Sequence, residues 1–199
     1  MEQLYRYIER YVELSLEDKW LLLSHTSKRT YLKGQYIVQQ GDVCNYENFV
    51  LNGCTRTFYL DKYGNEHVVM FAIRNWWTGD MGSFTTRTPA SYHVQCLDDT
   101  EVIQFTHEGL ELLYQKIPQL ERFFRLIVQK AFVASEKRVI ANFSKTARER
   151  YLEFLAKYPE IEQLVPQYMI ASYLGITKEF LSKIRSELRN EHLHHVNLD

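Results

Sequence analysis

The feature that most constrains the fold is a change of periodicity near Phe105. Between Lys28 and Phe105, short β-branched and aromatic runs alternate with glycine-containing turn signals, whereas from Thr106 onward apolar residues recur at helical spacing. The runs have the length and composition of strands and comprise residues 36–38, 48–51, 55–60, 67–73, 92–96 and 101–105. Asn52-Gly53 separates two of them, and this dipeptide is a strong hairpin signal. The pattern predicts an α+β chain whose first part is an antiparallel double-stranded β-helix or jelly roll, here called the β-roll.

Helices are expected on both sides of this β-rich segment. Residues 4–24 carry apolar residues at helical spacing, and Ser15 has the position of an N-cap. Thr106 is expected to cap a further helix, and Pro118 to begin a much longer one. We therefore expect a β-roll with N-terminal helices, a long helix and a small helical domain, over residues 1–116, 117–142 and 143–199.

The long helix contains a candidate dimer seam. Four of its residues share a 3,4,3 spacing, namely Phe124, Ile127, Ala131 and Ala134. This spacing is typical of a helix that packs along another helix. We favour a dimer in which the alanines meet a partner while Phe123 and Val128 face the sheet. The alternative is a helix buried against its own domain.

Residues 165–188 have the pattern of two short helices joined by a tight turn. Met169 and Leu174 belong to the apolar side of the first helix, and Gly175 permits the left-handed conformation that such a turn requires. Thr177 is a natural N-cap for the second helix.

The second helix is amphipathic when its residues are placed at about 100° intervals. Its apolar face is expected to hold Phe180, Leu181, Ile184 and Leu188. The opposite face is polar and basic, with Lys178, Glu179, Ser182, Lys183, Arg185, Ser186 and Arg189. A solvated helix face would also explain this pattern. The preceding turn favours a helix placed in the major groove of DNA, where Lys and Arg reach guanine or phosphate acceptors.

Four segments in this order resemble the Crp–Fnr family of bacterial transcription regulators. They are the β-roll signature at 33–42, the phosphate-cassette motif at 79–84, the long-helix segment at 133–137 and the helix-turn-helix at 165–188. The resemblance implies a homodimer that binds a near-palindromic DNA site and contacts RNA polymerase. It also implies that Lys178, Glu179 and Lys183 contact bases and that Thr177 contacts a phosphate.

The resemblance further implies an effector pocket, in cyclic AMP-dependent members a nucleotide site. Its residues would be Gly79, Asp80, Met81, Ser83, Ala90, Ser91, Ala134 and Ser135. Asp80 would grip the ribose and Ser91 the phosphate, but Ala90 stands where the family has the arginine that neutralises the phosphate. A buried phosphate without its cation costs several kcal/mol. Arg87 could substitute only if its loop bent differently. Cyclic AMP is therefore disfavoured, and both another small ligand and a ligand-free sensor remain open.

Other chemistries have weaker support. Cys44, Cys54 and Cys96 are expected to be free thiols, too few for a disulfide framework or an iron–sulfur cluster. The histidines at 192, 194 and 195 could bind a metal, but a solvated tail is favoured. Haem ligation through His67 or His93 has no support from spacing. No certain cofactor and no metal site are predicted, and nothing indicates an enzyme.

Charge and length set the remaining limits. The net charge of −1 excludes a chain coated in positive charge, yet residues 178–189 hold four bases against two acids. No apolar run is long enough for a membrane span, so we expect a cytoplasmic protein. About ten residues follow Arg189, without a hairpin pattern, so the β-hairpin wing common in the family should be short or absent. The predicted function is a sequence-specific DNA-binding regulator; the alternative is a ligand-binding or protein-interaction signalling module with vestigial DNA binding.

Overall fold

The computed structural model describes residues 1–196, with side chains described as far as Glu191. The chain forms two compact units, the first spanning Met1–Glu136 and the second beginning at Lys137. The boundary between them falls inside the long helix α5 (Pro118–Ser144), which continues two residues beyond its expected end. The histidines at 192, 194 and 195 fall where side chains are not described, and residues 197–199 lie outside the described part.

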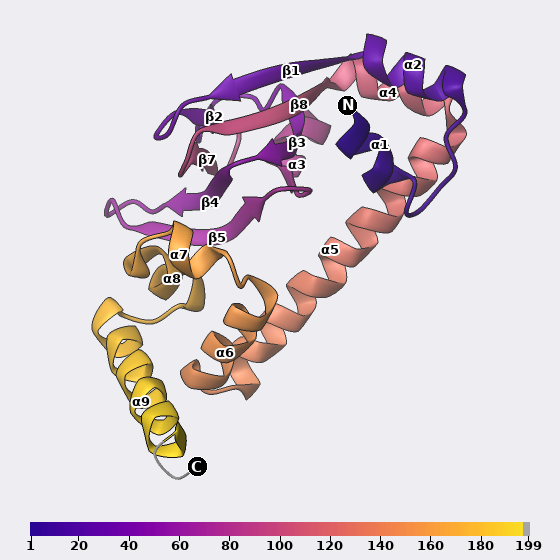
Figure 1. Ribbon diagram of the computed structural model, residues 1–199. Helices are drawn as coiled ribbons and strands as arrows, with labels where there is room; N and C mark the ends of the chain where they lie inside the picture. The colour runs from indigo at the N-terminus through magenta and orange to yellow at the C-terminus, as the bar shows by residue number, and fades with distance from the viewer. Residues whose placement is uncertain (197–199) are drawn as a thin grey trace. The chain divides into compact units, whose positions relative to one another are not determined.

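The first unit contains two four-stranded antiparallel sheets, ordered β1-β8-β3-β6 and β2-β7-β4-β5 (Figure 1). The strands are β1 (Thr26–Tyr31), β2 (Tyr36–Val38), β3 (Tyr46–Asn52), β4 (Cys54–Leu60), β5 (Glu66–Ile73), β6 (Trp77–Thr78), β7 (His93–Cys96) and β8 (Thr100–Thr106). The six predicted strands are all present, and the α+β class with an N-terminal β-roll is confirmed.

The turn at Asn52-Gly53 is not the hairpin that the sequence suggested, because β3 and β4 belong to different sheets, but its glycine has a steric reason. Gly53 has a φ of 94°, a region that favours glycine. A Cβ at this position would lie 2.6 Å from the carbonyl oxygen of Asp99. The glycine therefore lets the β3–β4 turn pass directly against the turn before β8, where the chain crosses from one sheet to the other.

Three elements of the first unit escaped the sequence pattern. The edge strand β1 is exposed at four consecutive residues, so it lacks the alternation of a half-buried strand. Strand β6 has only two residues, and α3 (Met81–Thr86) is a single short helix. Hydrogen bonds to β8 and β3, and a side-chain cap for α3, establish these elements.

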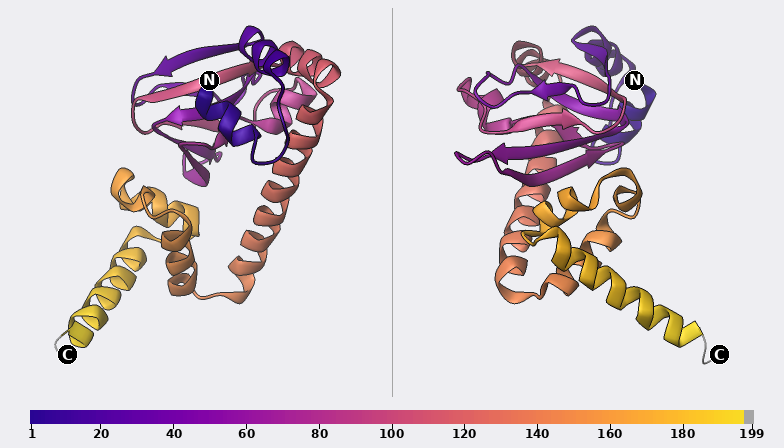
Figure 2. Two further views of the ribbon diagram at one scale, coloured as in Figure 1. Left: turned by 45° about the vertical axis from the view of Figure 1, so that its right-hand side comes forward. Right: turned by 90° about the vertical axis from the view of Figure 1, so that its left-hand side faces the viewer.

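Helices cover one face of the first sheet (Figure 2). They are α1 (Glu2–Ile8), α2 (Leu16–Ser24), α4 (His107–Lys116) and the first half of α5. Ser15 and Asp18 form the expected capping box, and Thr106 caps α4. Phe49 and Phe105 from the sheet pack with Phe123 and other apolar residues from these helices, while a smaller cluster around Val50 and Val102 fills the space between the sheets.

The second unit contains four helices after the end of α5. They are α6 (Ala147–Lys157), α7 (Ile161–Leu164), α8 (Gln167–Leu174) and α9 (Lys178–Val196). Thr146 and Glu149 form a capping box at the start of α6. The Arg150 guanidinium donates to the carbonyl oxygen of Leu174 at 3.2 Å, which ties α6 to the end of α8.

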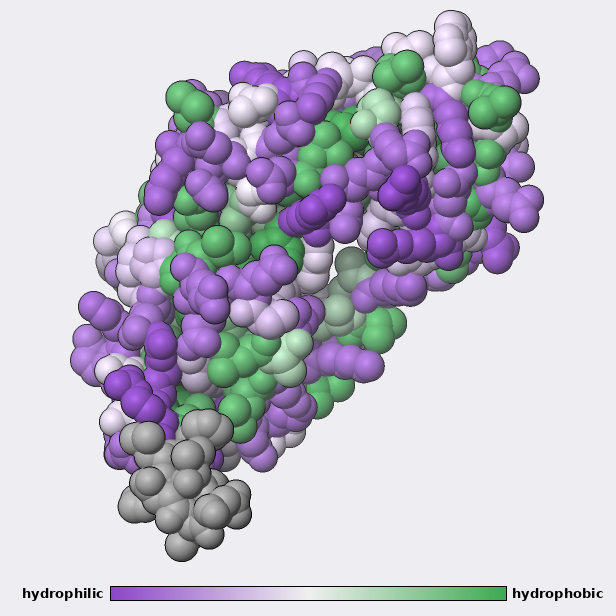
Figure 3. Space-filling view, in the orientation of Figure 1, coloured by the Kyte–Doolittle hydropathy of each residue, from purple (hydrophilic) through white to green (hydrophobic). Residues whose placement is uncertain are grey.

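The surface of the chain mixes polar and apolar residues on the face shown in Figure 3. None of the helices within residues 1–196 is long and apolar enough to cross a membrane.

Candidate functional site

The turn between α8 and α9 has the geometry that the sequence predicted. Gly175 adopts the left-handed conformation, with φ 66° and ψ 35°. Its N–H donates to Ser172 and the N–H of Ile176 donates to Ala171, which is the pattern of a Schellman motif. Thr177 Oγ1 then accepts the N–H of Phe180 at 3.1 Å and caps α9. These bonds hold the two helices in a helix-turn-helix.

The buried side of this motif differs from the prediction at one residue. Leu181 and Ile184 are buried, and Leu188 is half-buried, as expected. Phe180 was placed wrongly, because 47% of it is exposed. It lies about 100° from Leu181 around the helix, at the border of the apolar face, where angle alone does not decide burial.

The basic face of α9 is exposed. The exposed residues among the predicted DNA contacts are Thr177, Lys178, Glu179, Ser182, Lys183 and Arg189. Lys183 approaches Glu187 at 4.0 Å on the same helix, a contact that water screens. Because several donors project from consecutive turns of one helix, the face can reach both bases and phosphates.

Arg185 differs from the other predicted contacts. It forms an ion pair with Glu162 of α7 at 3.3 Å, and the same carboxylate accepts the hydroxyl of Tyr151. Burial is the main cause that raises the pKa of Tyr151, followed by its bond to Glu162. Arg185 therefore has a partner within its own unit, and this role was not visible in the sequence.

The predicted wing position is occupied by helix. Helix α9 continues beyond Arg189 to Val196. Within the described residues, this segment therefore forms helix and no β-hairpin.

In the β-roll, the carboxylate of Asp80 is hydrogen-bonded to backbone N–H groups. Its carboxylate accepts the N–H of Ser83 at 3.0 Å, of Ser91 at 2.8 Å and of Tyr92 at 3.3 Å, and it caps α3. Asp80 is only 5% exposed. A carboxylate with three donors has little capacity for a ribose hydroxyl, so the role that the resemblance implied for Asp80 does not fit.

Arg87 does not supply the missing phosphate cation. It adopts a left-handed conformation at the end of α3, with φ 57°. Its guanidinium donates to the Cys44 carbonyl at 2.9 Å and to Asn45 Oδ1 at 2.8 Å. Ala90 lies three residues after Arg87 in the sequence and is buried, and its side chain is only a methyl group. The cassette residues present do not fit a cyclic phosphate.

Beside Asp80 lies a buried carboxylate that sequence reasoning missed. Glu47 is 3% exposed, and its Oε1 has no hydrogen-bond partner among the described residues. A Cβ on Gly79 would lie 3.0 Å from that oxygen. Burial, and then the charge of Asp80, raise the pKa of Glu47 to about 8. Its alternation with Phe49 on the helix-covered face of β3 was the only available signal, and it indicates burial rather than ionisation.

The space between the sheets is lined by polar groups. Asn48 Oδ1 accepts the amide of Gln104 at 2.8 Å, and the hydroxyls of Thr55 and Thr78 lie 3.2 Å apart. Thr57 is buried, and its hydroxyl has no partner in the part of the chain that is described. The roll interior therefore retains an unused donor and acceptor.

The remaining predicted pocket residues are not all brought together. Ser83 bonds the N–H of Cys44 at 2.9 Å, so it belongs with Asp80 to the cassette. Met81 is exposed, and Ala134 and Ser135 lie on the exposed surface of α5. The structure of a single chain thus does not assemble the long-helix part of the implied pocket.

The predicted dimer seam needs a correction at Phe124. This residue is buried in its own core, where its ring lies 4.9 Å from that of Trp77. Val128, expected to face the sheet, is 46% exposed. Phe132 and Val139 are also exposed, and with Val128 they follow spacings of four and seven residues along one side of α5. Ile127 is half-buried, and Ala131 and Ala134 are exposed.

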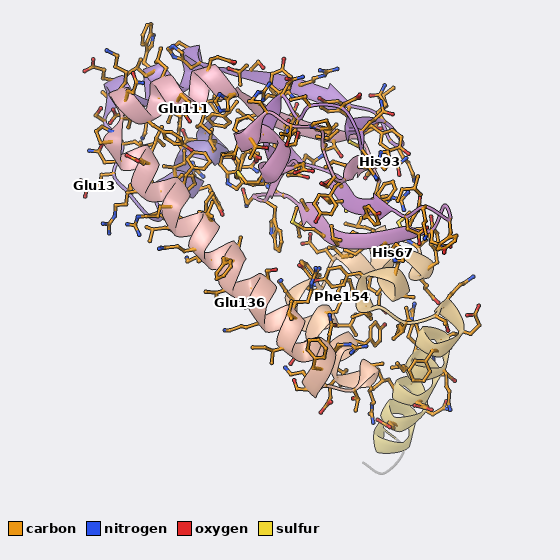
Figure 4. All side chains as sticks on the ribbon, turned by 180° about the vertical axis from the view of Figure 1, so that it is seen from behind. Glu13, His67, His93, Glu111, Glu136 and Phe154 are labelled. Carbon is orange, nitrogen blue, oxygen red and sulfur yellow. The ribbon has the colours of Figure 1, made fainter. Side chains whose placement is uncertain are left out.

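The three cysteines and the two histidines considered as haem ligands all lie in the first unit. Cys44, Cys54 and Cys96 are free and buried. His67 and His93 lie at separate places on the roll (Figure 4). His67 pairs with Asp61, and His93 Nδ1 accepts the N–H of Gln40. Within the described residues, no group of three or more His, Cys, Asp or Glu side chains is placed to hold a metal.

The comparisons with known proteins agree with this architecture. Residues 28–116 match the cyclic nucleotide-binding domain family. The transcriptional activator protein Anr of Pseudomonas protegens is 25% identical over 194 residues, covering 92% of this chain and 79% of Anr. The match therefore extends from the β-roll through the long helix into the helix-turn-helix. Over most of its length the chain is therefore similar to a transcriptional activator.

Two solved structures of other bacterial proteins share the fold. FixK2 from Bradyrhizobium japonicum has a TM-score of 0.73 at 20% identity, covering 84% of this chain and 86% of FixK2. The c-di-GMP responsive regulator CLP of Xanthomonas campestris has a TM-score of 0.72 at 15% identity, covering 90% and 94%. At these identities the likeness concerns the fold alone.

Proposed function

We propose that this chain is a homodimeric, sequence-specific DNA-binding transcription regulator. The observation that carries the proposal is the capped helix-turn-helix with an exposed basic face on α9. The naming of the relative Anr as a transcriptional activator supports it. A signalling module with vestigial DNA binding is not favoured, because its recognition helix would have no reason to keep this face.

The proposal assigns roles to individual residues. Lys178, Glu179 and Lys183 read base edges, since they lie in the first two turns of the helix. Thr177 bonds a phosphate with its hydroxyl hydrogen, because its oxygen is already used as the cap. Ser182 and Arg189 contact the sugar–phosphate backbone of the DNA. Arg185 contacts DNA only after leaving Glu162, so it contributes least.

Dimerisation occurs through α5 in this proposal. The exposed residues Val128, Phe132 and Val139 lie on one side of the helix, and Ser135 lies between them. Two such surfaces packed about a two-fold axis would remove the apolar side chains from water. This seam is rotated by one residue from the one that the sequence suggested.

The β-roll in this proposal does not respond to cyclic AMP. Asp80 and Arg87 are occupied within the chain, and Ala90 carries no charge. RNA polymerase is a further proposed partner. Because a regulator must share the compartment of the chromosome, the proposed location is cytoplasmic. No catalytic role is part of the proposal.

The test is DNA binding by the full chain, measured by fluorescence anisotropy on duplex DNA from upstream of its own gene. Replacing Lys178 and Lys183 together by alanine should weaken specific binding by about tenfold or more and reduce the salt dependence. The matched control replaces the exposed Lys33 and Lys116, which changes the net charge equally and should leave affinity unchanged. Wild-type protein that shows no salt-sensitive binding to this DNA would refute the proposal.

A further inference from the structure

A pocket of about 300 Å³ opens between the edge strands β1 and β2 and the loop that follows β2. Its lining residues are Arg29, Tyr31, Tyr36, Ile37, Val38, Gln39, Asp42, Val43, Asn45 and Tyr46. Tyr31 and Val38 are buried, whereas Arg29 and Asp42 are exposed. The pocket therefore combines buried and half-buried apolar residues with polar side chains, and polar groups make up most of its exposed lining. None of the cassette residues from Gly79 to Ser91 lines it.

Arg29 is held in place without a counter-charge. Its guanidinium carbon lies 4.6 Å from the centre of the Tyr31 ring, a cation–π contact. The Tyr31 hydroxyl accepts the amide of Gln104 at 3.1 Å, and Gln104 also bonds Asn48, so the ring is fixed. Arg29 forms no ion pair within the part of the chain whose side chains are described. Its N–H edge is therefore free to bind a carboxylate.

Asp42 supplies the opposite charge in the same pocket. Its N–H donates to Gln39 and its carbonyl accepts the N–H of Ala90 at 2.8 Å, so its backbone is fixed. As with Arg29, no ion pair involving Asp42 is found among residues 1–191, so the guanidinium nitrogens of Arg29 and the carboxylate oxygens of Asp42 lie more than 4.0 Å apart. Two opposite, uncompensated charges thus line one pocket.

This combination selects a class of ligand. A nucleotide would bring one or more negative charges and no positive charge to an arginine beside a carboxylate, so the carboxylate would be left without a partner. A zwitterion matches both charges, and an aromatic or branched side chain matches the apolar part of the lining, which is supplied by Tyr31, Ile37, Val38 and Val43. The volume is at the lower end of small-molecule pockets. We propose that this pocket binds a free amino acid with an aromatic or branched apolar side chain, its carboxylate on Arg29 and its ammonium group on Asp42.

The loop beneath this pocket is bonded to the cassette. Gly41 and Asp42 exchange hydrogen bonds with Ala90, Cys44 bonds Ser83, and Arg87 reaches Asn45. A ligand that shifts residues 41–45 on binding would therefore also shift α3 through these hydrogen bonds. The regulatory consequence rests on the proposed function, whereas binding itself does not.

Isothermal titration of the full chain with L-phenylalanine, L-tryptophan and L-leucine tests the proposal. At least one should bind saturably, while phenethylamine, which lacks the carboxylate, and 3-phenylpropionate, which lacks the amine, should bind about tenfold or more weakly. Arg29→Ala and Asp42→Asn should each weaken binding by a similar factor. Lys28→Ala is the control, because Lys28 neighbours Arg29 on β1 but pairs with Glu101 and does not line the pocket.

The outcomes separate clearly. Absence of binding by all three amino acids overturns the proposal. Equal binding of 3-phenylpropionate and phenylalanine also overturns it, because Asp42 would then play no part. Binding that persists in Arg29→Ala moves the ligand to another site. Since the titration contains no DNA, failure of the regulator proposal would leave these results unaffected, and the reverse also holds.

Discussion

At the residue scale, the cassette has exchanged ligand-binding groups for internal bonds. Asp80 binds three backbone N–H groups, and Arg87 binds the segment before β3. Each of these bonds satisfies a group that a phosphate or a ribose would otherwise use. The composition of the motif at 79–84 resembles a nucleotide cassette, but the partners of its side chains are in the chain itself.

The first prediction concerns cyclic AMP. The phosphate would be buried beside Asp80, and Ala90 stands where the family has the arginine that neutralises it. Calorimetry at micromolar cyclic AMP should therefore detect no binding. A cyclic AMP-dependent family member titrated in the same buffer is the control. A saturable heat with this chain would show that Asp80 and Arg87 can leave their partners.

The second prediction concerns Glu47. Its pKa is raised from 4.5 to about 8 in the folded chain, so folding favours the protonated form. Its contribution to stability is therefore complete below about pH 4.5 and is lost as pH rises toward 8, at up to about 1.4 kcal/mol per pH unit. Glu47→Gln should flatten this loss and be more stable than wild type at pH 8, measured by urea unfolding.

The exposed Glu13 provides a matched control for this measurement. Glu13→Gln should leave the pH dependence unchanged. If Glu47→Gln kept the wild-type slope between pH 5 and 8, the carboxylate would be ionised or solvated in solution.

At the scale of single elements, α5 has a different environment along its length. Its first turns are held by the roll, where Phe123 and Phe124 are buried against Trp77. Further along, Val128, Phe132 and Val139 are exposed. A helix with three exposed apolar residues at heptad-like spacing is expected to acquire a partner.

The third prediction distinguishes the two candidate seams. Phe132 and Ala134 are about 200° apart around the helix, so they cannot both lie at the centre of one interface. Phe132→Asp should give a monomer by sedimentation, because a charge would be buried in the seam. Ala134→Asp should remain a dimer. The reverse result would restore the seam that the sequence suggested.

At the scale of the whole molecule, modest net charge and a single basic helix suit a dimer. A charge of −1 gives no bulk attraction to DNA, so affinity must come from local contacts made twice. Specificity should therefore depend strongly on the spacing of the two half-sites.

The fourth prediction uses this spacing. Two recognition helices of a symmetric dimer read half-sites about one helical turn apart, roughly 34 Å. Inserting about five base pairs between the half-sites rotates one by half a turn and should reduce affinity to that of a single half-site. Replacing the same central base pairs without insertion is the control. Anisotropy that ignored the insertion would argue against a dimer that binds both half-sites together.

Much of the fold could be predicted from the sequence because it depends on interactions between residues that are close together in the chain. The strands, the caps at Ser15 and Thr106 and the turn at Gly175 depend on side chains within a few residues of one another. The edge strand β1 and the two-residue strand β6 could not be predicted from the sequence, because hydrogen bonds to strands distant in sequence establish them.

The sequence by itself determined the β-roll, the long helix and the helix-turn-helix, because periodicity and capping act over a few residues. Only the tertiary structure decided which charged groups are free. It gave Arg185 a partner in Glu162, engaged Asp80 and Arg87, and buried Phe124. It also left Arg29 and Asp42 in one pocket without an ion pair to any side chain that the structure describes. The physical reason is that pairing and burial depend on groups brought together from distant parts of the chain, and no local pattern records them.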